Sequence, residues 1–281
     1  MKKLLLSAFV ICLAGTSIAQ ESPLWMRHCA LSPDGTTIAF TYKGDIYTVP
    51  STGGRATQIT TNPAFDTEPV WSPDSKQIAF ASDRMGSLDV FVVSSEGGAP
   101  QRLTTHSGSE KPVAYKDNKH ILFTANIAPS AEDAGFPSGQ FQQVYEVAVT
   151  GGRPAMFSSM PMECISINKE GVMLYQDKKG YEDYWRKHQV SPIARDIWTY
   201  TPGKKPVYQK QTTFGGEDRE PVWSPDGKSF YYLSEEKGSF NIFQRTPGTT
   251  TSQQITFHTK HPVRFLSIST TGTLCYCLLY T

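Results

Sequence analysis

The chain has 281 residues, of which 38% are hydrophobic, 12% aromatic and 19% charged, and its formal net charge is +1. This is the composition of an ordinary globular protein, and the near-neutral charge gives no electrostatic bias toward nucleic acid or anionic lipid. The aromatic content suits a β-rich core, and the length alone allows one or two domains.

The first residues have the organisation of a secretory signal peptide. Lys2-Lys3 precedes an apolar stretch over residues 4–14, and Ser17-Ile18-Ala19 places small residues where a signal peptidase cleaves. No later segment is long and apolar enough to span a bilayer. The sequence therefore predicts a signal peptide over residues 1–19, removed near Ala19, and an exported, periplasmic or secreted mature protein.

The rest of the chain repeats one pattern. Pro69-Val70-Trp71-Ser72-Pro73-Asp74 recurs at residues 221–226, and residues 31–35 carry the same Ser-Pro-Asp-Gly turn. An apolar run, a polar break, an aromatic triplet, a glycine turn and a closing Leu/Ile-Thr follow. Proline presets the first central φ of a type I turn, and Gly-Gly supplies the positive φ of a tight hairpin. This order predicts four strands per repeat, which is one blade of a β-propeller.

Five copies of the repeat are complete and a sixth is partial. The sequence predicts an all-β fold, a single β-propeller domain of four-stranded WD40-like blades over residues 20–281. The tryptophans at matching first-strand positions, Trp71 and Trp223, are expected to be buried between blades. The expected blades cover residues of about 24–60, 61–104, 105–157, 158–213 and 214–256, with a truncated sixth blade at 257–281.

Two stretches depart from the repeat. Residues 126–142 are inserted in the third copy, and in the fourth Trp185-Arg186-Lys187-His188 runs into Ala194-Arg195-Asp196-Ile197-Trp198. With these insertions the chain resembles the amino-terminal six-bladed propeller of exported tricorn-type serine peptidases, from about Ser22 to Tyr276. The Ser-Pro-Asp-Gly blades also resemble, more distantly, the propeller of the Tol system.

The resemblance implies a non-catalytic propeller that serves as scaffold and as gate or filter for peptides. The family carries its serine nucleophile and histidine on later domains, which would be the partners of this propeller and are absent from these 281 residues. Residues 277–281 replace the charged turn and strand expected in the sixth copy. We therefore expect a fragment that ends before the catalytic domains. A stand-alone periplasmic Tol-like propeller that binds a protein partner is the alternative.

A search for chemistry within the chain finds no catalytic residue. There is no Gly-x-Ser-x-Gly elbow and no His-Glu-x-x-His helix. Ser166 and Ser234 each precede a lysine by three residues, but they stand at strand-turn junctions, where no helix would bring the lysine over the serine. The six histidines share no ligand spacing. We expect no cofactor and no metal.

The cysteines of the mature chain are predicted to be structural. Cys29, Cys164, Cys275 and Cys277 are scattered and lack the density of a disulfide scaffold. Cys275 and Cys277 alternate along a strand and so point to one face, too close to each other for a comfortable disulfide.

Two groups of charged residues are candidates for peptide binding. Glutamates recur just ahead of the first strand of successive blades, the strand that lines the central channel of a propeller, and a ring of carboxylates at the channel mouth would attract cationic peptide ends. Alternatively, each accepts backbone hydrogen bonds from the neighbouring blade. The basic cluster of the fourth-blade insertion would anchor a peptide carboxylate, or else form a solvated loop face or a dock for a later domain. The two groups are Glu68, Glu110, Glu163 and Glu220, and Arg186, Lys187, His188 and Arg195.

Overall fold

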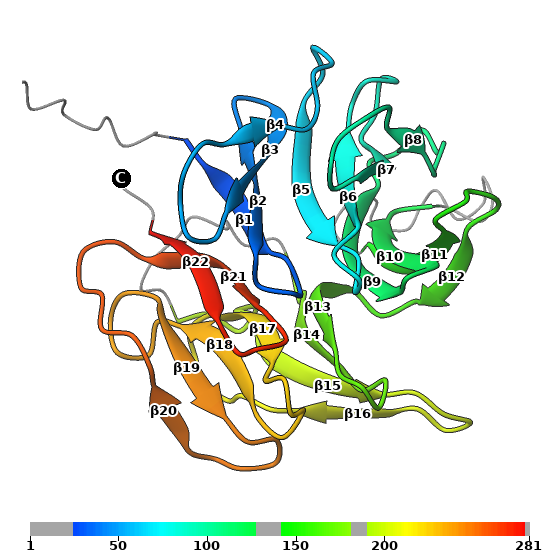
Figure 1. The fold of residues 1–281 in the computed structure, drawn as a ribbon. Coiled ribbons are helices and arrows are strands. Elements are labelled where there is room, and N and C mark those ends of the chain that lie inside the picture. Colours follow the sequence, from blue (N-terminus) through cyan, green and yellow to red (C-terminus); the bar gives the residue numbers. More distant parts are fainter. Residues whose placement is uncertain (1–24, 128–141, 181–189, 279–281) are drawn as a thin grey trace, which may run out of the picture.

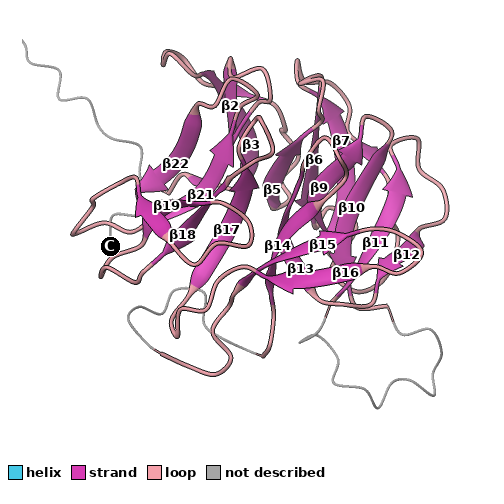
Figure 2. Ribbon diagram, turned by 90° about the horizontal axis from the view of Figure 1, so that it is seen from below, coloured by secondary structure: helices cyan, strands magenta, loops and turns pink. Residues whose placement is uncertain are grey.

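The computed structural model describes residues 25–127, 142–180 and 190–278, and every regular element in these ranges is a β-strand (Figures 1 and 2). The predicted signal peptide and most of the third-blade insertion lie outside these ranges. The described residues contain no helix long and apolar enough to cross a membrane.

The strands form five four-stranded antiparallel sheets and one two-stranded sheet, each built from strands consecutive in the chain. The first three sheets contain β1 (Arg27–Leu31), β2 (Thr37–Tyr42), β3 (Asp45–Pro50) and β4 (Thr57–Gln58); β5 (Asp66–Trp71), β6 (Gln77–Ser82), β7 (Asp89–Ser94) and β8 (Gln101–Arg102); β9 (Lys111–Asp117), β10 (His120–Ala125), β11 (Gln143–Ala148) and β12 (Ala155–Ser158). The others contain β13 (Met162–Ile167), β14 (Met173–Asp177), β15 (Ile197–Thr201) and β16 (Val207–Lys210); β17 (Asp218–Trp223), β18 (Phe230–Ser234), β19 (Asn241–Arg245) and β20 (Ser252–Gln254); and β21 (Val263–Ile268) with β22 (Leu274–Leu278). The predicted all-β propeller is confirmed, with five full blades and a partial sixth.

The Ser-Pro-Asp turns are held by their own side chains. In the second blade the Ser72 hydroxyl donates to the Asp74 carboxylate over 2.7 Å and accepts from the backbone N–H of Gln77 over 2.9 Å. The same serine-to-aspartate bond is 2.6 Å long at Ser32 and at Ser224. Because these bonds join residues at most five positions apart, the Ser-Pro-Asp motif favours the turn locally, and the turn connects the first two strands of the blade.

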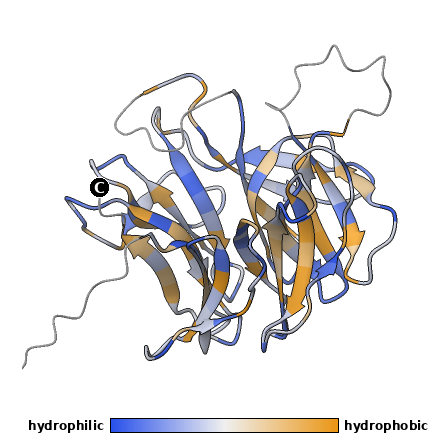
Figure 3. Cartoon of the chain, turned by 90° about the horizontal axis from the view of Figure 1, so that it is seen from above, coloured by the Kyte–Doolittle hydropathy of each residue, from blue (hydrophilic) through white to orange (hydrophobic). Residues whose placement is uncertain are grey.

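The hydrophobic core lies in layers between neighbouring blades, with the apolar residues on the strands (Figure 3). Trp71 is 8% exposed and packs against Ala39 and Ile46 of the first blade, and its indole N–H donates to the carbonyl of Ala30 over 2.9 Å. Trp223 is 7% exposed and donates to the carbonyl of Val172 over 3.1 Å. Both tryptophans therefore join their blade to the preceding one, as predicted.

The ring closes where the two-stranded sheet meets the first blade. All four strands of the first blade come from its own repeat. The Leu31 N–H donates to the Ser267 hydroxyl over 3.0 Å, and the Thr270 N–H donates to the Pro33 carbonyl over 2.7 Å. The two ends of the described chain thus meet through side-by-side sheets and not through a shared sheet (Figure 1).

Candidate functional site

The inner strands of the ring share an unusual backbone feature. β1, β5, β9, β13, β17 and β21 surround the centre of the ring, and each contacts the inner strand of the next blade (Figure 1). Each pairs with its second strand through a β-bulge, which sharpens the local twist. Five of the six carry a non-glycine residue in the left-handed region at the bulge, with φ between 50 and 59°: His28, Glu68, Cys164, Glu220 and Phe265.

The third blade departs from this pattern because of a proline. Lys111 and Thr67 occupy corresponding places, since they pair with Thr124 and Ala81 of their second strands. The next residue of β9 is Pro112, whose ring fixes φ near −65° and so forbids the left-handed conformation. The third blade therefore lacks a side chain equivalent to Glu68 at the bulge.

Glu68 spans the contact between the second and third blades. Its carboxylate accepts from the Lys111 ammonium over 2.6 Å, and both side chains keep about a third of their surface exposed, at 28% and 34%. On its other side, Thr67 and His28 share a hydrogen bond of 3.1 Å. Burial lowers the pKa of His28, with smaller effects from Glu68, Lys111 and Arg27. The partly exposed carboxylate of Glu68 therefore lies among polar groups of the inner strands.

Glu220 accepts a backbone hydrogen bond from the next blade, which was the alternative to a role in peptide binding. It is 6% exposed, and its carboxylate accepts the backbone N–H of Leu266 in the next blade over 2.8 Å. Its own N–H donates to the side-chain oxygen of Gln176 in the preceding blade over 2.9 Å. The residue thus links three successive sheets.

The four glutamates do not form one ring. Glu68 and Glu220 stand at the bulge, whereas Glu163 precedes its bulge residue by one position. Glu110 lies just before β9, at the place that Asp66 and Asp218 occupy in their blades, and like them it is almost fully buried. The reason is local spacing: Glu68 and Glu220 directly precede a proline, while Lys111 separates Glu110 from Pro112.

Two buried carboxyls at this position have raised pKa values. Burial raises the pKa of Glu110 to about 7, although hydrogen bonds from Thr104 and the His106 N–H oppose the change. Burial also raises the pKa of Asp218 to about 7, against hydrogen bonds from Ser234 and Thr212. Both residues lie at contacts between blades, because the Glu110 N–H donates to the Leu88 carbonyl and the Asp218 N–H donates to the Arg195 carbonyl of the preceding blade.

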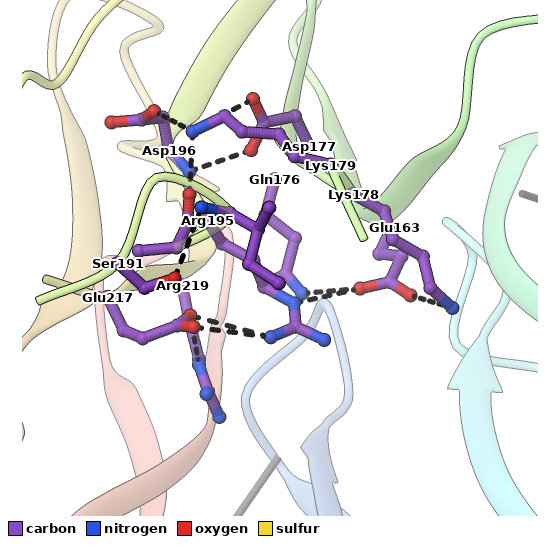
Figure 4. A network of polar contacts seen from close by, with 12 residues as sticks. Glu163, Gln176, Asp177, Lys178, Lys179, Ser191, Arg195, Asp196, Glu217 and Arg219 are labelled. Atoms are coloured by element: carbon purple, nitrogen blue, oxygen red, sulfur yellow. Dashed lines mark hydrogen bonds and ion pairs between the residues drawn. The ribbon is translucent and has the colours of Figure 1, made fainter. Parts of the chain in front are cut away.

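Arg195 is the centre of a buried ion-pair network between the fourth and fifth blades (Figure 4). It is 6% exposed, and its guanidinium donates to Glu163 over 3.2 Å and to Glu217 over 3.4 Å. Glu217 also accepts from Arg219 over 2.8 Å. Burial alone would lower the pKa of Arg195, but the carboxylates of Glu163 and Glu217 outweigh it and raise the pKa above its usual value.

Glu163 completes the network. Its carboxylate also accepts from Gln176 over 2.9 Å and pairs with Lys178 at 3.2 Å. Burial alone would raise its pKa, but Arg195 and Lys178 lower it below its usual value. Arg195 is therefore a buried interblade cation and not part of a solvated loop face.

A second group of charges lies beside this network. The Asp196 carboxylate pairs with Lys179, and with Lys210 at 2.8 Å. Asp177 accepts the Asp196 N–H over 2.8 Å and the indole N–H of Trp198 over 2.9 Å. These contacts hold the start of β15 after the fourth-blade insertion (Figure 4). The other three predicted basic residues, Arg186, Lys187 and His188, lie outside the described residues.

Most members of the network could not be recognised from the sequence alone. Gln176 lies on β14, Arg219 on β17 and Glu217 just before β17, so each is separated from Arg195 along the chain. The sequence does contain one indication of it. Three charged residues, Glu217, Asp218 and Arg219, stand just before the apolar Pro-Val-Trp of an inner strand, and charged side chains that are buried there need partners of opposite charge.

The two serines that precede a lysine by three residues have structural partners. The Ser166 hydroxyl accepts the backbone N–H of Trp223 over 3.1 Å, and the buried Ser234 hydroxyl accepts the backbone N–H of Glu236 over 3.3 Å. Within the described ranges no group of three His, Cys, Asp or Glu side chains is arranged to hold a metal ion.

The chain matches the family described as Tricorn protease N-terminal beta propeller domain over residues 23–277. It is 39% identical over 213 residues to Tricorn protease homolog 1 of Streptomyces coelicolor, covering 75% of this chain and 19% of that protein.

Solved structures agree on the fold. The tricorn protease superposes with a TM-score of 0.74 at 17% identity, covering 92% of this chain and 24% of the other. TolB from Acinetobacter baumannii gives a TM-score of 0.56 at 17% identity, covering 81% of this chain and 56% of the other. The chain spans about a fifth of the length of its Streptomyces relative. This chain belongs to the family of tricorn protease N-terminal β-propeller domains.

Proposed function

We propose that this chain is the non-catalytic propeller of an exported tricorn-like serine peptidase, in which it acts as scaffold and as gate or filter for peptides. The family match over residues 23–277 carries this proposal. The share of the Streptomyces protease homolog that the chain covers supports it, because most of that protein lies beyond the region matched here. Hydrolysis would then belong to other domains of a longer protein.

Of the predicted peptide-binding residues that the structure describes, Glu68 is the one best placed to meet a peptide. Its carboxylate is partly exposed at the inner-strand bulge, and Lys111 is its cationic partner. Glu110 and Glu220 are buried, and Glu163 and Arg195 pair with each other within the ion-pair network. We therefore assign the recognition of a peptide amino terminus to Glu68, and structural roles to the other four.

The test measures binding and hydrolysis by the purified chain. Fluorescence anisotropy compares labelled peptides with free and with acetylated amino termini, and Glu68→Gln should weaken only the free-amine peptides, by at least about fivefold. Glu146→Gln is the matched control, because Glu146 pairs with Lys116 at 2.7 Å on the same blade as Lys111, away from the bulge position. The chain should hydrolyse none of these peptides.

Equal affinities for the Glu68 and Glu146 variants would reject the assigned role of Glu68. Serine-inhibitor-sensitive hydrolysis by the chain alone would reject the non-catalytic assignment. A reading frame for peptidase domains that continues directly after Thr281 would support the peptidase over the Tol-like alternative, whereas high affinity for a folded protein partner and none for peptides would favour the latter.

A further inference from the structure

Three cysteines meet at the closure of the ring. Cys29 lies on β1 of the first blade, while Cys275 and Cys277 lie on β22 of the last sheet. Cys275 pairs with Ser267 of β21, and Ser267 accepts the Leu31 N–H of β1, so this part of β22 lies close to the first blade. The contact joins residues that are almost the whole chain apart.

The thiol of Cys29 points into this seam. It donates to the backbone carbonyl of Phe265 over 3.4 Å, and β1 packs against β22, the strand that carries Cys275 and Cys277. Cys29 is buried, whereas the two cysteines of β22 are partly exposed. All three are thiols in the structure.

We propose that Cys29 forms a disulfide with Cys275 or Cys277 and thereby joins the first and last blades covalently. A bond between the two neighbours on β22 would link a strand to itself and constrain nothing. A bond to Cys29 would instead join the first and last sheets, which lie at opposite ends of the described chain and so are not linked by a connecting loop as the other neighbouring blades are.

The three thiols differ in pKa and in exposure, and these differences favour thiol–disulfide exchange in two steps. The neighbouring thiols of Cys275 and Cys277, and burial as the smaller effect, raise the pKa of Cys29. The neighbouring Cys29 thiol lowers the pKa of Cys275 and of Cys277 despite their burial. The accessible thiols of β22 are therefore the better nucleophiles, and the buried thiol of β1 is the resolving group.

The reaction needs a disulfide oxidant such as oxidised glutathione. A β22 thiolate attacks one glutathione sulfur, forms a mixed disulfide and releases one glutathione thiolate. Cys29 loses its proton and attacks the protein sulfur of the mixed disulfide, which releases the second glutathione. Two protein thiols are oxidised, one glutathione disulfide is reduced to two thiols, and the protein loses two protons.

The test uses the full chain in glutathione buffers of increasing oxidised fraction. Non-reducing proteolysis with mass spectrometry should find the Cys29 peptide linked to the Cys275-Cys277 peptide in monomeric protein. The oxidised form should unfold at a temperature higher by roughly 4–12 °C, and dithiothreitol should reverse this shift. Cys164→Ser should keep both results, because Cys164 lies on another inner strand, while Cys29→Ser should lose both.

Single variants then identify the partner. If Cys275→Ser abolishes the crosslink and Cys277→Ser does not, the bond is to Cys275, and the converse assigns it to Cys277. A Cys275–Cys277 bond, crosslinks only between molecules, or intact thiols in fully oxidised buffer would overturn the proposal. The peptide map of the unaltered chain decides the matter even if a variant does not fold.

Discussion

Replacing Trp223 with alanine should weaken the contact between the fourth and fifth blades. The side chain is 7% exposed and packs in one layer with Leu174 and Ile197 of the preceding blade. Removing a buried tryptophan costs about 3–5 kcal/mol through lost transfer free energy and the cavity left behind. The lost indole bond to the Val172 carbonyl is part of that cost, and by itself is about 1 kcal/mol.

Urea unfolding followed by far-UV circular dichroism measures this free energy. Trp223→Phe keeps most of the ring but loses the N–H donor, so it should cost less than the alanine variant. Trp25→Ala is the matched control, because Trp25 is 71% exposed and its loss should change the free energy of unfolding by no more than about 0.5 kcal/mol. A Trp223→Ala protein as stable as the Trp25→Ala protein would refute the interblade role.

Three further outcomes follow from the buried charges. Arg195→Met should cost about 1.5–3 kcal/mol in urea unfolding, since it removes the charged donor that Glu163 and Glu217 share and leaves them with Lys178 and Arg219 alone. Lys178→Met, at the edge of the same network, should cost under about 1 kcal/mol, and equal losses would contradict this. The pKa of Glu110 is about 7 when folded and 4.5 ordinarily, so its protonated form favours folding: this contribution is full below pH 4.5 and lost as the pH rises through about 7. As the pH rises from 4.5 to about 7, the urea concentration at the unfolding midpoint should therefore fall less for Glu110→Gln than for the unaltered chain. An equal fall in the two proteins would mean that another group titrates in this range. Asp218→Asn should act likewise, because its folded pKa of about 7 also exceeds its ordinary value of 3.8.

The blades were predictable because each rests on local chemistry. Ser72 and Asp74 form a hydrogen bond within their own turn, and the same bond forms in the Ser-Pro-Asp motifs at Ser32 and Ser224. Trp71 could be placed between blades because a large apolar residue at a repeated strand position must be buried against a neighbouring repeat. Local rules of this kind need no knowledge of the rest of the chain.

The site was less predictable because its contacts join distant segments. The distances from Arg195 to Glu163 and Glu217 depend on how two blades pack, which no spacing in the sequence specifies. Glu110 was grouped with Glu68 because both were expected just ahead of a first strand, yet Glu110 corresponds to Asp66, two positions before Glu68. The approach of Cys29 to β22 depends on closure of the entire ring.

The left-handed backbone conformation of the inner-strand residues costs free energy, and this cost indicates that their side chains are needed. A residue with a Cβ atom in this conformation is disfavoured by roughly 1–2 kcal/mol, and glycine would remove that strain. The inner strands place His28, Glu68, Cys164, Glu220 and Phe265 there. Strain of this kind persists where the side chain itself is needed. Replacing Glu220 with glycine would remove the backbone strain but also the hydrogen bond that its carboxylate accepts from the next blade. Replacing Glu68 with glycine would remove the strain together with the carboxylate that lies among the polar groups at the bulge.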